Sequence, residues 1–405
     1  MNKVRLVCKG QEFSHWTKVT ITSGLNELSR SFTLEVTYML PRQNHLHDLF
    51  KPGDKVQIFI DDDLILSGYI DKTPIRYDAH SINVQIIGRS KTVDLIECNP
   101  WPEGDPIQFD NDWTVAPTPS DVIVYDPNSV TTRSKHKDKL GTALATLVGA
   151  YGIRLKAYND PDIRKKLDAV KDVNVKPEST LYDIIAAVVI GNDILITDDE
   201  NGDLLVLKKG GQKASDDLTL GNNILTGSAD FDATKLFQTY SCSGHKKGDD
   251  NVSGRQLQTN GRAVDDQVSR RRYKYLNNVS EDDNCLNQAE GERDFQRAQY
   301  EKVTYTVYGW RQRKSNELWK INQTVKVTDF MLGFNEKEML IQKVDFSLDN
   351  SGGMITTLEV IPPEGYKTEP KKGAEANTPS SSKSFSQVNN SLISNQSLKL
   401  NKNRY

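Results

Sequence analysis

The residues that could do chemistry are scattered, and none has a familiar catalytic spacing. His45 and His47 could share one side of an extended segment, but no Cys or carboxylate stands nearby at zinc-site spacing. Cys242-x-x-His245 is half of a zinc motif and is more typical of a strand end. The groups Asp61–Asp63 and Asp198–Asp203 resemble calcium loops only in acidity, since Lys209 stands where the second loop would need Glu. We interpret both as hairpin turns and expect no catalytic residue, metal or cofactor.

The strongest basic run is the basic strip formed by Arg270, Arg271, Arg272, Tyr273 and Lys274. Arginine beside tyrosine can bind phosphates and stack on bases. However, acidic residues 281–283 follow closely, and 52 Lys+Arg against 55 Asp+Glu give a net charge of -3. A dedicated nucleic-acid binder is expected to be basic. The strip is therefore a candidate subunit interface, with a solvated face as the alternative.

We place the first domain at residues 1–98, and its sequence pattern is that of β-strands. Phe32, Leu34 and Val36 alternate with polar residues, which is the period of a half-buried strand. Further strand-like runs follow at 56–60, 64–66, 69–76 and 82–87, and a short helix is expected at 91–98. An antiparallel meander of this kind can close into a barrel and so remove its exposed edges.

Residues 99–218 are predicted to form a Pro-rich connection, at 99–137, followed by a small α/β domain. Helical spacing of apolar residues predicts helices over 140–151 and 181–190, the first opened by Asp138. The second has a capping box, formed by Thr180 and Asp183. Residues 193–197 and 203–207 are predicted to form a hairpin.

From residue 219 to 366 the pattern predicts a second β-barrel domain, with a helix over 286–300 and a mobile loop over 244–262. Residues 367–405 are rich in Ser and Asn and are basic, which is typical of a flexible tail. The longest apolar stretch, near 184–190, is too short to span a bilayer, so we expect no membrane anchor. The 405 residues therefore divide into an α+β, β-rich multidomain fold.

The two β-domains resemble each other. Val56-Gln-Ile58 in the first corresponds to Val325-Lys-Val327 in the second, and a long hairpin follows in both. We also match Arg30-Ser-Phe32 with Lys235-Leu-Phe237 as strand openings. The predicted fold is two tube-like antiparallel β-barrel domains that flank a small α/β domain. Three such chains could place six like domains around one axis.

Several segments resemble the bacteriophage Mu-type baseplate hub (baseplate assembly) family. The most specific is Gly88-Arg-Ser-Lys-Thr92-Val-Asp94-Leu-Ile-Glu-Cys98. Others are Gly10–Thr17, Leu64–Asp71, Pro177–Asp183, Arg271–Tyr273 and Trp319–Val327. The resemblance covers most of residues 1–365, and it departs at the Pro-rich stretch and at the tail.

This resemblance implies a non-enzymatic homotrimer in the virion, at the baseplate of a contractile tail, assembled in the bacterial host cytoplasm. Its implied partners are the central spike protein, the tail tube protein, baseplate wedge proteins and the tape-measure protein. DNA would pass through the lumen without specific binding, which a near-neutral chain favours.

Two alternatives stay open at this point. The first is the hub of a related injection machine or tailocin. The second, from another class, is a cell-wall glycan-binding protein or hydrolase, because paired carboxylates for sugar hydrolysis meet only in three dimensions.

Overall fold

The structure is a computed structural model. It describes residues 3–39, 49–101, 109, 113–125, 139–170, 175, 177–192, 194–208, 210–245, 258–277, 285–349 and 352–365. His45, His47, Asp138 and the predicted tail lie outside these ranges. Strands dominate the described residues, so the predicted β-rich α+β fold is confirmed.

The first β-module is a curved antiparallel sheet with the order β3-β4-β8-β6-β5-β1-β2. Its strands are β1 (Val4–Cys8), β2 (Gln11–Phe13), β3 (Lys18–Gly24), β4 (Ser31–Met39), β5 (Lys55–Ile60), β6 (Asp63–Lys72), β7 (Ile75–Tyr77) and β8 (Ser81–Ser90). The short β7 continues the line of β6 beside β8. Helix α2 (Val93–Glu97) follows, within the predicted 91–98 range.

The second β-module repeats this arrangement. Its strands are β13 (Gln212–Lys213), β14 (Leu218–Thr219), β15 (Ile224–Ala229), β19 (Val303–Tyr308), β20 (Gln323–Asp329), β21 (Phe334–Asp349) and β22 (Gly353–Ile361). The order β15-β19-β22-β21-β20 matches β3-β4-β8-β6-β5 strand for strand. The predicted match of Val56 with Val325 is consistent with this correspondence, because their partners Gly68 and Met339 occupy equivalent positions.

One predicted match is wrong. Residues after Phe237 form β16 (Thr239–His245), which lies in a separate three-stranded sheet. The counterpart of β4 is instead β19, which pairs with β15 and β22 as β4 pairs with β3 and β8. The error arose because an aromatic residue before an alternating run does not reveal which sheet the run joins.

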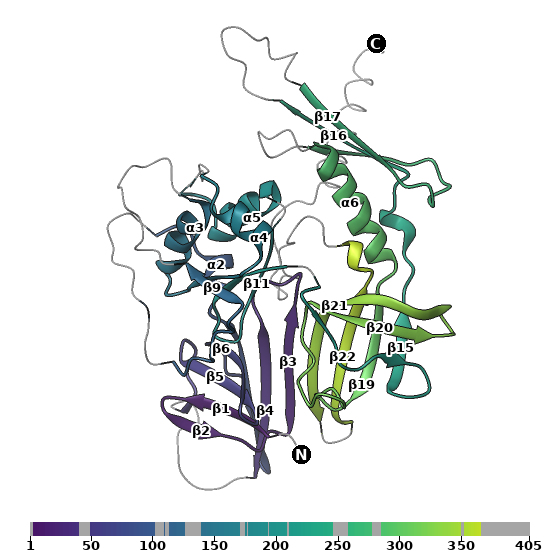
Figure 1. The fold of residues 1–405 in the computed structure, drawn as a ribbon. Helices are drawn as coiled ribbons and strands as arrows, with labels where there is room; N and C mark the ends of the chain where they lie inside the picture. The colour runs from purple at the N-terminus through teal and green to yellow at the C-terminus, as the bar shows by residue number, and fades with distance from the viewer. Residues whose placement is uncertain are drawn as a thin grey trace, which may run out of the picture. The chain divides into compact units, whose positions relative to one another are not determined.

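The two modules meet edge to edge through β3 and β21, which lie side by side in Figure 1. Their antiparallel register runs from Lys18 opposite Asp349 to Gly24 opposite Lys343. Apolar side chains of both modules belong to one continuous core, which includes Ile21 and Phe346. The junction is thus a continuation of the sheet.

The α/β domain holds a sheet of order β11-β12-β10-β9 with its own core. Its elements are β9 (Val122–Tyr125), α3 (Leu140–Gly149), β10 (Leu155–Tyr158), α4 (Pro161–Leu167), α5 (Leu181–Asn192), β11 (Leu195–Asp198) and β12 (Leu204–Leu207). The capping box is confirmed, since the amide of Asp183 donates to Thr180 Oγ1 over 3.2 Å. Helix α4 was not predicted, although Asp160 before Pro161 is an N-terminal signal.

The three-stranded sheet has the order β17-β16-β18 and packs against helix α6 (Figure 1). Its other elements are η2 (Ala233–Lys235), β17 (Gln258–Val264), β18 (Tyr273–Asn277), α6 (Cys285–Tyr300) and, after β22, η3 (Pro363–Gly365). Part of the predicted mobile loop is therefore strand β17. Gly261 is required there because a Cβ would lie 2.2 Å from the backbone carbon of Cys285. No described helix is both long and apolar enough to cross a membrane.

Candidate functional site

Arg30 joins the first β-module to the α/β domain through a buried ion pair. Arg30 lies just before β4 and is 8% exposed. Its Nε donates to Asp198 Oδ1 over 3.2 Å, and its Nη1 donates to the carbonyl of Ile65 over 2.7 Å. Ser90 at the end of β8 donates to Asp198 Oδ2 over 2.5 Å. Two strand ends of the module thus hold one carboxylate of β11.

The rest of the β11–β12 turn is charge-compensated in the same way. Lys156 Nζ, on β10, lies 2.5 Å from Asp199 Oδ2 and 2.9 Å from Asp203 Oδ2. Lys91 reaches Asp203 Oδ1 from the first β-module over 3.4 Å. Buried charges are costly unless paired. The Lys156 pairs therefore stabilise the turn within the α/β domain, and the Lys91–Asp203 pair links that domain to the module. The turn is a hairpin, as predicted.

A short segment of the Pro-rich stretch, residues 113–116, which we call the strap, covers this junction. The side-chain amide of Gln57 donates to the carbonyl of Thr114 over 2.7 Å, and the backbone amide of Thr114 donates to Gln57 Oε1 over 3.0 Å. The amide of Ala116 donates to Asn201 Oδ1 over 2.8 Å. Trp113 packs edge-on against Tyr69, with ring centroids 6.0 Å apart. The side chains of Gln57 and Asn201 thus bind backbone groups of the strap that a neighbouring strand would otherwise bind.

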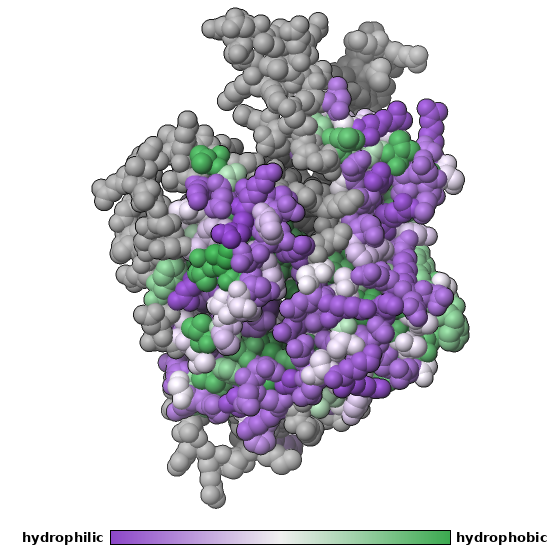
Figure 2. Space-filling view, viewed as in Figure 1, coloured by the Kyte–Doolittle hydropathy of each residue, from purple (hydrophilic) through white to green (hydrophobic). Residues whose placement is uncertain are grey.

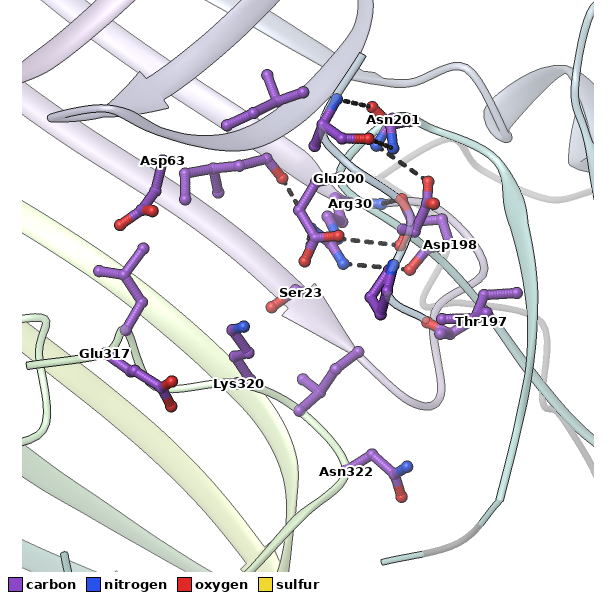
Figure 3. A pocket seen from close by; sticks show the side chains of 18 of the residues that line it. Ser23, Arg30, Asp63, Thr197, Asp198, Glu200, Asn201, Glu317, Lys320 and Asn322 are labelled. Atoms are coloured by element: carbon purple, nitrogen blue, oxygen red, sulfur yellow. Dashed lines mark hydrogen bonds and ion pairs between the residues drawn. The ribbon is translucent and has the colours of Figure 1, made fainter. Parts of the chain in front are cut away.

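A cavity of 690 Å³ opens between the two β-modules, the strap and the α/β domain (Figure 3). Its polar lining is mixed in charge. Arg30, Asp198 and Glu200 lie on one side, with Glu317 and Lys320 of the second module on another. The described residues that line it include neither His nor Cys.

Asp198 is a cavity-lining carboxyl whose raised pKa resembles that of a general acid. Burial raises its pKa to about 6, although Arg30 and the hydroxyl of Ser90 oppose the shift. However, its side chain is 1% exposed, and both oxygens already accept hydrogen bonds. The carboxyl therefore has no direct path to a substrate, and its contacts are those of a structural link.

The turn Asp61–Asp63 between β5 and β6 also forms as predicted. Arg311 of the second β-module lies 3.0 Å from Asp61 Oδ2 and 2.8 Å from Asp63 Oδ2. The turn is thus a second contact between the modules. Within the described residues, no group of His, Cys, Asp and Glu has the arrangement of a metal site.

The basic strip is divided by the structure. Arg272 donates from Nη1 to the carbonyl of Leu236 over 2.8 Å, from Nη2 to that of Thr234 over 2.9 Å, and stacks on Phe237. Lys274 pairs with Glu292 of α6 over 2.6 Å. Arg270, Arg271 and Tyr273 are exposed. Two of the five predicted residues thus join their strand to segments packed beside it, the η2 region and α6, and three face outward.

Sequence reasoning missed the polar junction, by which we mean the buried contacts of Arg30 and Lys91 of the first module with Asp198 and Asp203 of the α/β domain. It also missed three features of the β-module surfaces. Among the described strands, β7 pairs only with β8, and β15 pairs only with β19. At the tip of the β20–β21 hairpin, Phe330 and Met331 are 74% and 75% exposed. Adjacent exposed apolar residues in a hairpin turn were a readable signal of a contact surface.

Comparison with known families finds two matching domains. Residues 3–90 match the model of the Mu phage baseplate assembly protein GpP-like N-terminal domain. Residues 283–369 match the model of the fourth domain of Mu phage baseplate assembly protein GpP. Baseplate hub protein gp44 of Escherichia phage Mu is 26% identical over 372 residues, which cover 90% of this chain and 89% of that protein.

Solved structures support the same fold. The 43 kDa tail protein of prophage MuSo2 from Shewanella oneidensis matches with a TM-score of 0.71 at 22% identity, covering 91% of this chain and 100% of that one. The tail protein from Neisseria meningitidis MC58 matches with a TM-score of 0.65 at 16% identity, covering 90% and 99%.

Proposed function

We propose that this chain, which resembles Mu-type phage baseplate hub proteins, is itself such a hub, and that three copies form a ring that joins the trimeric central spike to the hexameric tail tube. As a baseplate hub protein, it is a structural component of the phage tail. The proposal adds the trimer, the adaptor role and a role in starting tube polymerisation.

The observation that carries this proposal is the internal repeat. One chain contains two β-modules with the same five-strand order, joined by a continuous sheet. Three copies with two modules each supply six similar modules around one three-fold axis. Such a ring matches a six-fold partner on one face and a three-fold partner on the other.

Further partners follow from this role. The lumen would hold the tape-measure protein and later pass DNA, and the α/β domain would meet the baseplate wedges. A chain of net charge -3 would not retain DNA by phosphate binding. We assign Arg270, Arg271 and Tyr273 as candidate contacts with a neighbouring subunit, because their side chains face outward. Assembly would take place in the bacterial host cytoplasm.

The test is the mass and image of the purified protein. Native mass spectrometry should report a trimer, and negative-stain images should show a ring with a central hole and six similar lobes. A chain that stays monomeric at micromolar concentration, with spike and tube proteins present, would contradict the proposal. Release of muropeptides from purified cell wall would instead favour the hydrolase alternative.

A further inference from the structure

We infer that the ring closes by antiparallel pairing of β15 of one copy with β7 of a second copy, in the register that β3 and β21 use within one chain. This inference rests on the proposed function, because it names the surface through which the proposed ring would form. It follows from the internal repeat and from the two strand edges described above.

The contact within the chain provides the template. In the first β-module, Ile21 of β3 lies opposite Phe32 of β4 on one side and Phe346 of β21 on the other. Thr20 likewise lies opposite Ser347. A strand of one module therefore already pairs with the long strand of the other.

The repeat identifies the strands that occupy these positions at the other ends of the modules. Ala229 of β15 pairs with Val303 as Ile21 pairs with Phe32, so β15 is the counterpart of β3. Ile75 of β7 pairs with Val84 of β8 as Phe346 pairs with Thr356 of β22, so β7 is the counterpart of the C-terminal half of β21.

The template then fixes the pairs between copies. Ala229 would lie opposite Ile75, and Ser228 opposite Arg76. Both edges are available among the described strands, since β15 pairs only with β19 and β7 only with β8, and the one further bridge of β15, from Ile224 to Leu220, lies at its other end. Tyr77, at the end of β7, is 81% exposed. Unpaired strand edges are ready sites for strand addition by another chain.

Pro74 does not block the proposed edge. Its carbonyl accepts a hydrogen bond from the amide of Gln85 on β8 over 3.0 Å. The N–H and C=O positions of one strand residue face the same side. The donor that Pro74 lacks would therefore face β8, and the neighbouring residues Thr73 and Ile75 present their backbone groups to the open edge.

The charges of the two edges are complementary. Lys72 and Arg76 are exposed along the β7 edge, and Asp230 and Asp232 follow β15. In the template register Lys72 lies opposite Asp232, and Arg76 is diagonal to Asp230. Opposite charges at such positions favour one register and one partner over others.

The β20–β21 hairpin supplies a second contact. Its tip is the counterpart of the turn Asp61–Asp63, which contacts Arg311 of the neighbouring module within the chain. Phe330 and Met331 stand at this tip, and Figure 2 shows hydrophobic residues at the margin where β15 and this hairpin lie. The same contact between copies would therefore bury apolar surface instead of an ion pair.

Disulfide trapping tests the register. Ser228→Cys and Arg76→Cys are combined in the full chain, because directly opposed residues of an antiparallel pair have the Cα spacing of a disulfide. Mild oxidation should give covalent trimers on a denaturing gel, which reductant returns to monomer. Each single variant should stay monomeric, which also controls for the four native cysteines.

A matched control uses the contact between β3 and β21 within one chain. Thr20→Cys with Ser347→Cys should form a disulfide within one chain under the same oxidation, found by peptide mass mapping. If native mass spectrometry shows the trimer while the Ser228/Arg76 pair gives no disulfide between copies, the pairing is overturned and the proposed function stands. If the chain is monomeric throughout, both are overturned.

Discussion

The two β-modules share a strand order but differ in what they carry at equivalent positions. Arg30 precedes β4 and is buried in the polar junction with Asp198. Its counterpart, Glu301, precedes β19 and forms a half-exposed pair with Lys337. The difference shows that the two modules share their strand order, whereas equivalent residues at the strand ends differ and contact different neighbours.

The cores of the two modules differ in the sizes of paired side chains, and each pair fills its space in a different way. Phe32 lies opposite Gly88 in the first module, and the equivalent pair in the second is Val303 opposite Val360. A Cβ at Gly88 would lie 2.6 Å from the ring of Phe32 and 2.1 Å from the carbonyl oxygen of Tyr69. A large residue therefore fills the space that glycine leaves, and two medium residues fill it in the other module.

The largest effect is expected at the polar junction. Arg30→Ala removes the cation beside buried Asp198, and breaking one partner of a buried pair costs about 3–5 kcal/mol. We expect the free energy of unfolding in urea to fall by that amount. Glu301→Ala, at the equivalent position of the second module, should cost under about 1 kcal/mol because its ion pair is half exposed. Equal losses in both variants would remove the difference between the modules.

The next largest effect on stability is expected at Gly88, which lies opposite Phe32. Gly88→Ala forces a methyl group against a backbone oxygen that cannot move away alone, and overpacking of this kind should cost about 3 kcal/mol. Val360→Ala, at the equivalent position, removes two methyl groups and should cost about 1–2 kcal/mol. Thermal unfolding of both variants shows which of the two loses more stability. A Gly88→Ala variant as stable as the wild type would refute the close packing described here.

The polar junction should also make stability depend on pH. The pKa of Asp198 is raised to about 6 in the folded chain, above its ordinary value of 3.8. The folded state therefore binds more protons between these values, and its stability falls as pH rises from 4 to 7. The expected loss is roughly 2 kcal/mol. Asp198→Asn should remove this slope, so parallel pH curves for the two proteins would contradict the assignment.

Sequence patterns predicted the local elements well because a strand or helix is set by nearby residues. The alternation at Phe32, Leu34 and Val36 is strand β4, and the spacing within 286–300 is α6. Both acidic turns were also predicted. The ion pairs of those turns were not, because Asp198 and Arg30 are 168 residues apart and charge spacing along a chain does not encode such a pairing.

The repeat was predicted in part for the same reason. Val56 and Val325 stand in equivalent strands with equivalent hairpins, so their match depends only on local order. The match of Phe32 with Phe237 failed because it required knowledge of which sheet each strand joins. The open edges of β7 and β15 could be identified only after the strand partners were known.

The smallest effect is expected at Tyr305, whose counterpart in the first module is Leu34. The hydroxyl of Tyr305 donates to Asp329 Oδ2 over 2.9 Å, and the other oxygen of Asp329 accepts from the amide of Met331 over 3.0 Å. Burial and the neighbouring carboxylate raise the pKa of Tyr305, so the hydroxyl stays a donor. Tyr305→Phe should lower the free energy of unfolding by about 1–2 kcal/mol, since Asp329 loses a buried partner.

Tyr308→Phe is the matched control, because it removes a hydroxyl from the same strand at an exposed position and should change stability by under about 0.5 kcal/mol. Urea unfolding of both variants separates the two roles. If Tyr305→Phe weakens the proposed trimer more than it weakens the folded chain, then the hydrogen bond holds Phe330 and Met331 in place for a neighbouring copy. If both variants unfold like the wild type, then the second module does not depend on this bond, and the β20–β21 tip is fixed by its turn alone.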